Sequence, residues 1–349
     1  MCIRDRDEMA AVEALHASGC TDGLPVIVPT TERVERMILA SGQAGDMALG
    51  TMGPGHGMAT IEKVAVAAVM AGCLPDYMPV VLAAAKAVID PVFDLTEMQA
   101  TTHCTAPLII VNGPVRHNCA IASGYGALGP GHRANASIGR ALRLCMINIG
   151  KAQPGSSDMA LLGHPGKFSY CLAEDEENSP FPPLHVALGF APEQSVVTVI
   201  GAEAPHSVLF AGDGDNPNAY KALLELLAIG IANPATNNAI LTGGTAVVVL
   251  NPEHGAILTK AGLTREDIAQ EIHNHSVLSQ AQLQRYAGGF SRPEETERHA
   301  FTGPEQLLVM MAGGSGLYSM VMPTWCAGTH RNSPSSVVVE DAFYCELPG

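Results

Sequence analysis

Cys73 is the residue whose type and position point most directly to a reaction. It lies in the turn between two apolar segments that are predicted as helices, one over 60–70 and one beginning at Asp76. Gly72 is a suitable end for the first helix, and Asp76 is a suitable N-cap for the second. The partial positive charge at a helix N-terminus favours the thiolate, which is the reactive form of cysteine. We therefore expect Cys73 to be a nucleophile or redox thiol that is alkylated near neutral pH faster than the other cysteines.

His103 is the expected base for this thiol. A histidine that meets a cysteine through space activates the sulfur by removing its proton. Its neighbour Cys104 is a poorer partner, because adjacent side chains on an extended chain point to opposite faces. The alternative is that His103 only caps the strand that follows it by hydrogen bonds.

A glycine-rich segment, 124–133, leads directly into a predicted helix over 134–149. Backbone N–H groups at such a helix start bind anions, and Arg133 and Arg140, on one helix face, add donors for a carboxylate or phosphate. The alternative is a tight turn that needs its glycines, with arginines paired to surface acids. The expected substrate-binding residues are Gly129, Gly131, His132, Arg133, Ser137, Arg140, Asn112 and His56.

A metal site is the second possibility, because the acidic run 174–177 and His185 could hold Mg²⁺ or Mn²⁺. Acidic runs are more often solvated turns, and neither an H-E-x-x-H motif nor paired cysteines occur. The alternative ligand set is His56, His103, Glu174 and His185. The sequence identifies no cofactor.

Short apolar runs that end in polar turns indicate the elements that must position these residues. Continuous apolar runs are typical of strands buried on both faces. The predicted strands are 107–111, 195–200, 245–250 and 307–311, and the helices between them are 134–149, 218–232 and 264–274. We expect an α/β fold with a layered, largely parallel sheet flanked by helices.

The chain also contains a weak internal match. Residues 109–117 and 248–254 both run from a strand through Asn and Pro to His, which is compatible with two related halves. The best boundary follows the proline-rich segment near residue 190, giving halves 8–190 and 191–349. Residues 1–7 resemble translated adapter sequence from an assembly of environmental reads, and are set aside with Cys2.

Composition excludes several classes of function. The 349 residues are 47% hydrophobic and 15% charged, with a formal net charge of −15. Nucleic acid and anionic membranes are poor partners for such a chain, and no apolar run reaches the roughly 20 residues that span a bilayer. The low charge suggests that some surface is covered in a homo-oligomer. The absence of a C-x-x-C pair and of a secretory signal favours a reducing cytoplasm.

Three longer phrases, at 70–81, 127–140 and 165–177, resemble an uncharacterised bacterial family. The resemblance covers most of residues 20–325, and the segment from Thr329 fits it least well. Its members accompany small proteins that carry a Sec/Cys-Gly-Ser-Cys (UGSC) motif. That motif is absent here, so the resemblance implies that a companion protein supplies the thiol or selenol. It implies no substrate.

These observations predict a thiol-dependent enzyme that acts on a small anionic substrate, with reductive or thiol-transfer chemistry. Cys73 and His103 would be catalytic, and Arg133 and Arg140 would hold the anion. A metal-dependent lyase or hydrolase is one alternative. A non-catalytic subunit that binds a ligand for a redox complex is the other.

Overall fold

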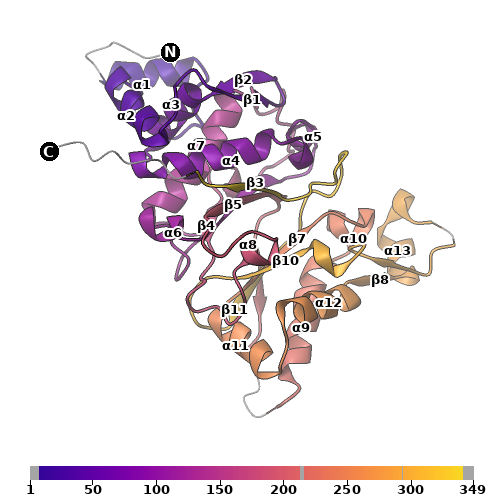
Figure 1. Ribbon diagram of the computed structural model, residues 1–349. Coiled ribbons are helices and arrows are strands. Elements are labelled where there is room, and N and C mark those ends of the chain that lie inside the picture. The colour runs from indigo at the N-terminus through magenta and orange to yellow at the C-terminus, as the bar shows by residue number, and fades with distance from the viewer. Residues whose placement is uncertain (1–7, 213–215, 293, 341–349) are drawn as a thin grey trace.

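The fold has four layers, in the order helices, sheet, sheet, helices. A computed structural model describes residues 8–212, 216–292 and 294–340, so the predicted adapter segment 1–7 lies outside the described residues. Two four-stranded sheets pack face to face, and helices cover the outer face of each (Figure 1). The mixed α/β class is confirmed. A largely parallel sheet is not, because each sheet contains one parallel pair and two antiparallel pairs.

The first sheet lies under the N-terminal helices. Its strand order is β12 (Ser335–Val338), β5 (Val196–Ala202), β3 (Ala106–Asn112) and β4 (Cys171–Ala173). The α-helices of this part are α1 (Glu8–Ala17), α2 (Thr31–Ser41), α3 (Ile61–Ala71), α4 (Met78–Ile89), α5 (Leu95–Ala100), α6 (Val115–Asn118) and α7 (Arg133–Asn148). A small hairpin, β1 (Ala48–Met52) and β2 (Gly57–Thr60), precedes α3.

The second sheet has the order β10 (Leu307–Met311), β7 (Ala246–Leu250), β11 (Tyr318–Met322) and β6 (His206–Leu209). Its α-helices are α9 (Ala219–Ile231), α10 (Asn237–Leu241), α11 (Pro252–Lys260), α12 (Arg265–His275) and α13 (Gln280–Tyr286). A hairpin, β8 (Val277–Ser279) and β9 (Glu297–His299), lies beside α13, and α8 (Leu184–Ala187) connects β4 to β5. Short 3₁₀ turns are η1 (Pro75–Tyr77), η2 (Pro91–Phe93), η3 (Pro165–Lys167), η4 (Gly288–Phe290) and η5 (Pro304–Gln306).

The apolar runs in the sequence have a direct explanation in this stack. Alternate residues of a strand point to opposite faces of its sheet. In β3, Ile109 and Val111 pack into the core under the helices, whereas Leu108 and Ile110 pack against the other sheet. Both faces are therefore buried, and the four predicted strands are confirmed as β3, β5, β7 and β10.

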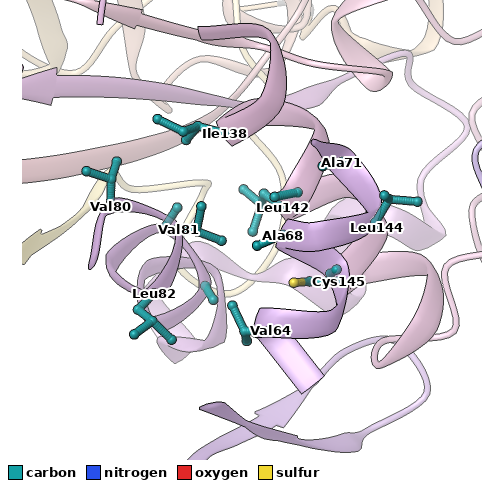
Figure 2. Packing of buried hydrophobic residues seen from close by; sticks show 14 of the residues in the cluster. Val64, Ala68, Ala71, Val80, Val81, Leu82, Ile138, Leu142, Leu144 and Cys145 are labelled. Carbon is teal, nitrogen blue, oxygen red and sulfur yellow. The ribbon is translucent and has the colours of Figure 1, made fainter. Parts of the chain in front are cut away.

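Helices α3, α4 and α7 form the core that carries the Cys73 turn. Leu142 and Cys145 of α7 lie close to Ala68 of α3 and Val81 of α4 (Figure 2). The alanines of α3 let the backbones approach, so that α3 and α7 share one of the largest contacts between elements. Buried residues occur along the whole length of α3, so packing against this core holds the end of the helix in position.

The two sheets share one strand pattern and exchange their edge strands. In each sheet a central strand (β3 or β7) pairs in parallel with a later strand (β4 or β10) and antiparallel with another (β5 or β11). The strand after β5, β6, joins the second sheet, and the strand after β11, β12, joins the first. The predicted boundary at residue 190 falls between β3 and its partner β5, so strands from both sides of it form the first sheet. The matched segments 109–117 and 248–254 begin in the two central strands.

Candidate functional site

Cys73 lies at the carboxyl end of α3, not at the start of the next helix. Gly72 takes the left-handed conformation (φ 87°) and its N–H donates to the carbonyls of Ala68 and Val69. The N–H of Cys73 donates to the carbonyl of Ala68 at 3.0 Å, which completes a Schellman cap. The expected N-cap role of Asp76 is wrong, because it belongs to the turn η1 and α4 begins only at Met78. Cys73 therefore lies between the carboxyl end of α3 and Leu74, the N-cap of η1.

Burial decides the protonation state of this thiol. Cys73 is 8% exposed, and burial raises its pKa from 9.0 to about 12. Hydrogen bonding with Ser137 and the charges of Arg133 and Arg140 lower the pKa, but by less than burial raises it. The expected ionisation of Cys73 by a helix N-terminus is not found, and the thiol is neutral at pH 7.

Cys73 nevertheless opens onto a cavity of about 210 Å³ that is rich in positive charge. Arg33, Arg36 and Arg133 line it together with the thiol. Arg133 approaches from the first turn of α7, where its Nε and Nη2 donate to the carbonyl of Gly72 at 3.2 and 3.0 Å. Arg133, one of the two arginines predicted to hold the anion, thus contacts the residue that precedes Cys73.

The two arginines of α2 were not identified from the sequence. Arg33 forms an exposed ion pair with Glu8 at 2.6 Å and donates to the carbonyl of Val28. Arg36 is exposed, and within 8–212, 216–292 and 294–340 its guanidinium has no hydrogen bond or ion pair. The signal that could have identified them is their spacing of one turn on a face beside the buried Val34 and Met37.

His103 does not serve Cys73. Its Nε2 lies 2.9 Å from Glu203 Oε1, and its Nδ1 lies 2.9 Å from the side-chain amide of Asn237. Both ring nitrogens are occupied, and His103 is not among the residues that line the Cys73 cavity. His103 is therefore not placed to act as the base for this thiol. Cys104 faces elsewhere, as expected, and accepts the N–H groups of Leu162 and Gly163.

Arg140 is occupied by a buried carboxylate rather than available for a substrate. Its Nε and Nη2 donate to the two oxygens of Asp22 at 2.7 and 2.8 Å, and it also reaches the carbonyls of Leu24 and Pro25. The Asp22 side chain is 3% exposed, so this pair fixes the N-terminal loop to α7. Of the two arginines predicted to hold the anion, only Arg133 lines the Cys73 cavity. Ser137, one turn earlier, donates to the carbonyl of Arg133.

The glycine-rich segment 124–132 is used for packing. Gly129 N–H donates to Gly126, and His132 Nε2 lies 3.2 Å from the Tyr125 carbonyl. The segment meets the loop 312–316 that follows β10, because Tyr125 Oη donates to the carbonyl of Ser315 at 3.3 Å. Next to it, the N–H of Gly313 donates to the carbonyl of Ser123 at 2.7 Å. Neither Gly129, Gly131 nor His132 lines the Cys73 cavity. The segment therefore packs against the loop that follows β10 and lies outside the Cys73 cavity.

Asn112 and Glu174 belong to a buried polar cluster at the ends of β3 and β4. Asn112 Nδ2 donates to Glu174 and Glu176 at 2.6 and 2.9 Å, and Arg265 Nη2 lies 3.3 Å from Glu174. Burial raises the pKa of Glu174, and Arg265 opposes this rise. Asn112 therefore holds this polar cluster together, and it does not line the Cys73 cavity, where the substrate was expected.

The alternative metal ligands are not gathered. His56 lies at the exposed tip of the β1–β2 hairpin with φ 53°, and His103 is held by Glu203. His185 is buried near the polar cluster, with Nδ1 4.0 Å from Glu176. In the part of the chain that the structure describes, no group of three or more His, Cys, Asp or Glu residues is arranged to hold a metal ion. The structure therefore does not bring the four predicted ligands together.

Comparison with known proteins does not assign the chain to a family. No protein-family model, curated protein sequence or solved structure matches the chain significantly. Among the described residues, no helix has both the length and the apolar composition needed to cross a membrane.

Proposed function

We propose that the protein is a thiol-dependent enzyme that binds a small anionic substrate in the Cys73 cavity. One observation carries this proposal: the Cys73 thiol and the guanidinium groups of Arg33, Arg36 and Arg133 line the same cavity. Grouped guanidinium donors are suited to a carboxylate or phosphate, which they bind through charge-assisted hydrogen bonds.

The cavity favours a small substrate. Its volume of about 210 Å³ is below the range of roughly 300–1,000 Å³ that is usual for drug-sized ligands. Arg36 contributes most to the expected affinity, because Arg33 is already paired with Glu8 and Arg133 with the Gly72 carbonyl. The remaining wall is apolar and includes Met37, Val69 and Leu74, which would contact the body of the substrate.

Thiol transfer suits this lining better than hydrolysis. A hydrolase needs a base for its nucleophile or for water, and the described residues that line the cavity include neither histidine nor carboxylate. In thiol–disulfide exchange, the Cys73 sulfur, once deprotonated, attacks one sulfur of an anionic disulfide. The disulfide bond breaks, a mixed disulfide forms, and the leaving thiolate takes up a proton equal to the one that Cys73 released. A thiol or selenol companion protein would then reduce the mixed disulfide.

This chemistry sets the conditions of the proposal. Cys73 must lose its proton against the effect of burial, so turnover is expected to be slow at neutral pH unless the partner protein or substrate changes the surroundings of the thiol. A reducing compartment is required to return the thiol, so the proposed location is the cytoplasm. A homo-oligomer remains a prediction from the low charge of the chain.

The raised pKa also favours a second candidate, a subunit that binds a small anion without reacting. In that case Arg36 and its neighbours would bind the ligand, and Cys73 would be a buried side chain of the wall. The two candidates differ in one measurable event, which is the formation of a mixed disulfide on Cys73.

The test compares two small disulfides of similar size, dithiodiglycolate, which is anionic, and bis(2-hydroxyethyl) disulfide, which is neutral. Mass spectrometry of the full chain at pH 8.5 follows the adduct on Cys73. We expect faster modification by the anionic disulfide, and Arg36→Ala should remove this preference without changing the rate with the neutral one. Arg285→Ala, an exposed arginine on α13 outside the cavity, is the matched control.

The outcomes separate the candidates. Equal rates with the two disulfides would overturn the anion-binding role of the cavity. Binding of dithiodiglycolate that depends on Arg36 but leaves Cys73 unmodified would establish the non-reacting subunit. Undiminished turnover by a Cys73→Ser protein with its companion would end the thiol mechanism.

A further inference from the structure

A second cavity, of about 580 Å³, lies between α7 and the segment 153–168. Its volume falls within the roughly 300–1,000 Å³ of typical small-molecule sites. It shares no lining residue with the Cys73 cavity. We propose that this second cavity binds a small amphiphilic acid, a molecule with one anionic group and an apolar body.

The charges at the cavity leave room for one negative group. Asp158 is 3% exposed and lies between Arg143 Nη2 at 2.8 Å and Lys167 Nζ at 3.0 Å. Two cations around one carboxylate leave one positive charge in excess. The other acid of the lining, Asp22, is already matched by Arg140. A monoanionic ligand would therefore balance the site, whereas a cation would not.

The two cations also keep donors for a ligand. A lysine ammonium has three N–H donors and an arginine guanidinium has five. Lys167 uses two of its donors, toward Asp158 and the carbonyl of Thr105 at 3.2 Å. Arg143 uses two, toward Asp158 and Gln99 at 3.3 Å. Toward the rest of the described chain the remaining N–H groups have no partner, and a carboxylate is the acceptor that fits them best.

The remaining walls are mainly apolar. Ile147 of α7 and Ala160 line the cavity together with the more exposed Leu162 and Phe168. Leu162 is 94% exposed and Phe168 is 47% exposed, so large apolar side chains stand in water beside the cavity. An apolar ligand body would remove part of this surface from water, at roughly 25 cal/mol per Å² buried. This combination of apolar wall and few convergent charges is typical of small-molecule sites.

The test uses 11-(dansylamino)undecanoic acid, whose fluorescence rises in an apolar environment, and its methyl ester, which has the same body without the charge. Both are titrated into the full chain at pH 7.5. We expect the acid to bind about tenfold more tightly than the ester, as a hydrogen-bonded charge pair provides. Lys167→Met should remove that difference and leave the affinity for the ester unchanged.

Two exposed phenylalanines provide a matched pair for the apolar wall. Phe168 lines the cavity, whereas Phe290, which is 61% exposed, lies in η4 of the other half of the fold. Phe168→Ala should weaken the binding of both acid and ester several-fold, and Phe290→Ala should change neither. These two variants do not touch the Asp158 ion pairs, so they remain informative if Lys167→Met does not fold.

Equal affinity for acid and ester in the unmodified protein would overturn the proposal. So would an affinity for the acid that Phe168→Ala leaves unchanged, or that falls equally with Phe290→Ala, because the probe would then bind elsewhere. Absence of binding by both probes would have the same meaning.

Discussion

Ala202 and Thr324 pair in an isolated antiparallel bridge that joins the ends of β5 and β11. The two residues are equivalent in the two sheets. Ala202 follows Val199 by three positions, and Val199 pairs with Ile109 of β3; Thr324 follows Val321 by three, and Val321 pairs with Val248 of β7. The bridge therefore lies where the two similar strand arrangements meet. Beyond it, the chain continues from β5 to β6 in the second sheet, and from β11 to β12 in the first. This relationship supports the hypothesis of two related halves.

The exchanged strand β12 protects an edge of the first sheet. β12 pairs along β5 from Ser335 to Val338, and Val339 beyond it is buried. Ending the chain after Ser333 should expose the apolar edge of β5, lower the free energy of unfolding by about 2 kcal/mol or more and cause self-association. Size-exclusion chromatography and urea unfolding measure both effects.

The matched control for this truncation is a chain that ends after Glu340. It keeps β12 and the contacts of Glu340 with Lys86 and Gln43. A shorter chain that stays monomeric and as stable as this control would show that β12 contributes little, and that the exchange is incidental.

Much of the fold could be predicted because burial leaves a pattern in the sequence. The apolar runs of β3, β5, β7 and β10 were identified, and the helix predicted over 134–149 is α7 (Arg133–Asn148). Strand direction could not be predicted, since a strand between helices and a second sheet is equally apolar in either direction. The pairing of β5 with β3 across residue 190 could not be predicted either, because no local pattern in the sequence shows which strand a given strand pairs with.

The site was less predictable, since its chemistry depends on partners far apart in the sequence. Arg133, predicted to hold the anion, does reach the Cys73 turn through the carbonyl of Gly72. Arg140 looked equally available, but its partner Asp22 lies 118 residues away. The turn around Cys73 could either end the first helix or cap the start of the next one. In the structure the N–H groups of Gly72 and Cys73 form a Schellman cap that ends α3.

The Arg140–Asp22 pair should be essential to the stability of the fold. Arg140→Ala leaves the buried Asp22 carboxylate without its two charge-assisted hydrogen bonds. We expect a loss of about 3 kcal/mol in the free energy of unfolding, as is usual when one partner of a buried pair is removed. Denaturant unfolding measures this loss, and Asp22→Asn in the same background should recover part of it. A change below 0.5 kcal/mol (about the level of a surface substitution) would contradict the assignment.

The two acids of the polar cluster should respond very differently to removal. Glu174 is fully buried and accepts hydrogen bonds from Asn112 and the N–H of Leu184, both at 2.6 Å, beside Arg265. Glu174→Ala should cost about 3 kcal/mol or more, because it leaves a buried guanidinium unpaired. Glu177 is 51% exposed, and although Arg116 holds its pKa at about 2, Glu177→Ala should cost less than about 1 kcal/mol.

Thermal or urea unfolding of the two variants at pH 7 checks this ranking. Arg116 keeps Glu176 at 2.9 Å when Glu177 is removed, which is why the smaller effect is expected there. Equal losses in the two variants would show that burial of Glu174 does not govern its contribution.

Buried thiols should make the protein lose stability at alkaline pH. Burial raises the pKa of Cys145 above its ordinary value of 9.0, so the unfolded chain gives up this proton first. The free energy of unfolding should therefore fall as pH rises above about 9, by about 1.4 kcal/mol per pH unit for each such thiol. Cys145→Ala should reduce that slope by one thiol, although it also costs stability at pH 7. Leu142→Ala, a truncation in the same core without a titrating group, should keep the full slope.

The alkylation rate of Cys73 should report its raised pKa directly. With a pKa of about 12, the thiolate fraction rises tenfold with each pH unit throughout the accessible range. The rate with neutral iodoacetamide, followed on Cys73 by mass spectrometry, should therefore increase about tenfold per unit from pH 7 to 9.5 without a plateau. Arg133→Ala should slow the reaction at every pH, because the charge of Arg133 lowers the thiol pKa. A plateau near pH 8 would mean that the cavity stabilises the thiolate after all, and that burial does not control this sulfur.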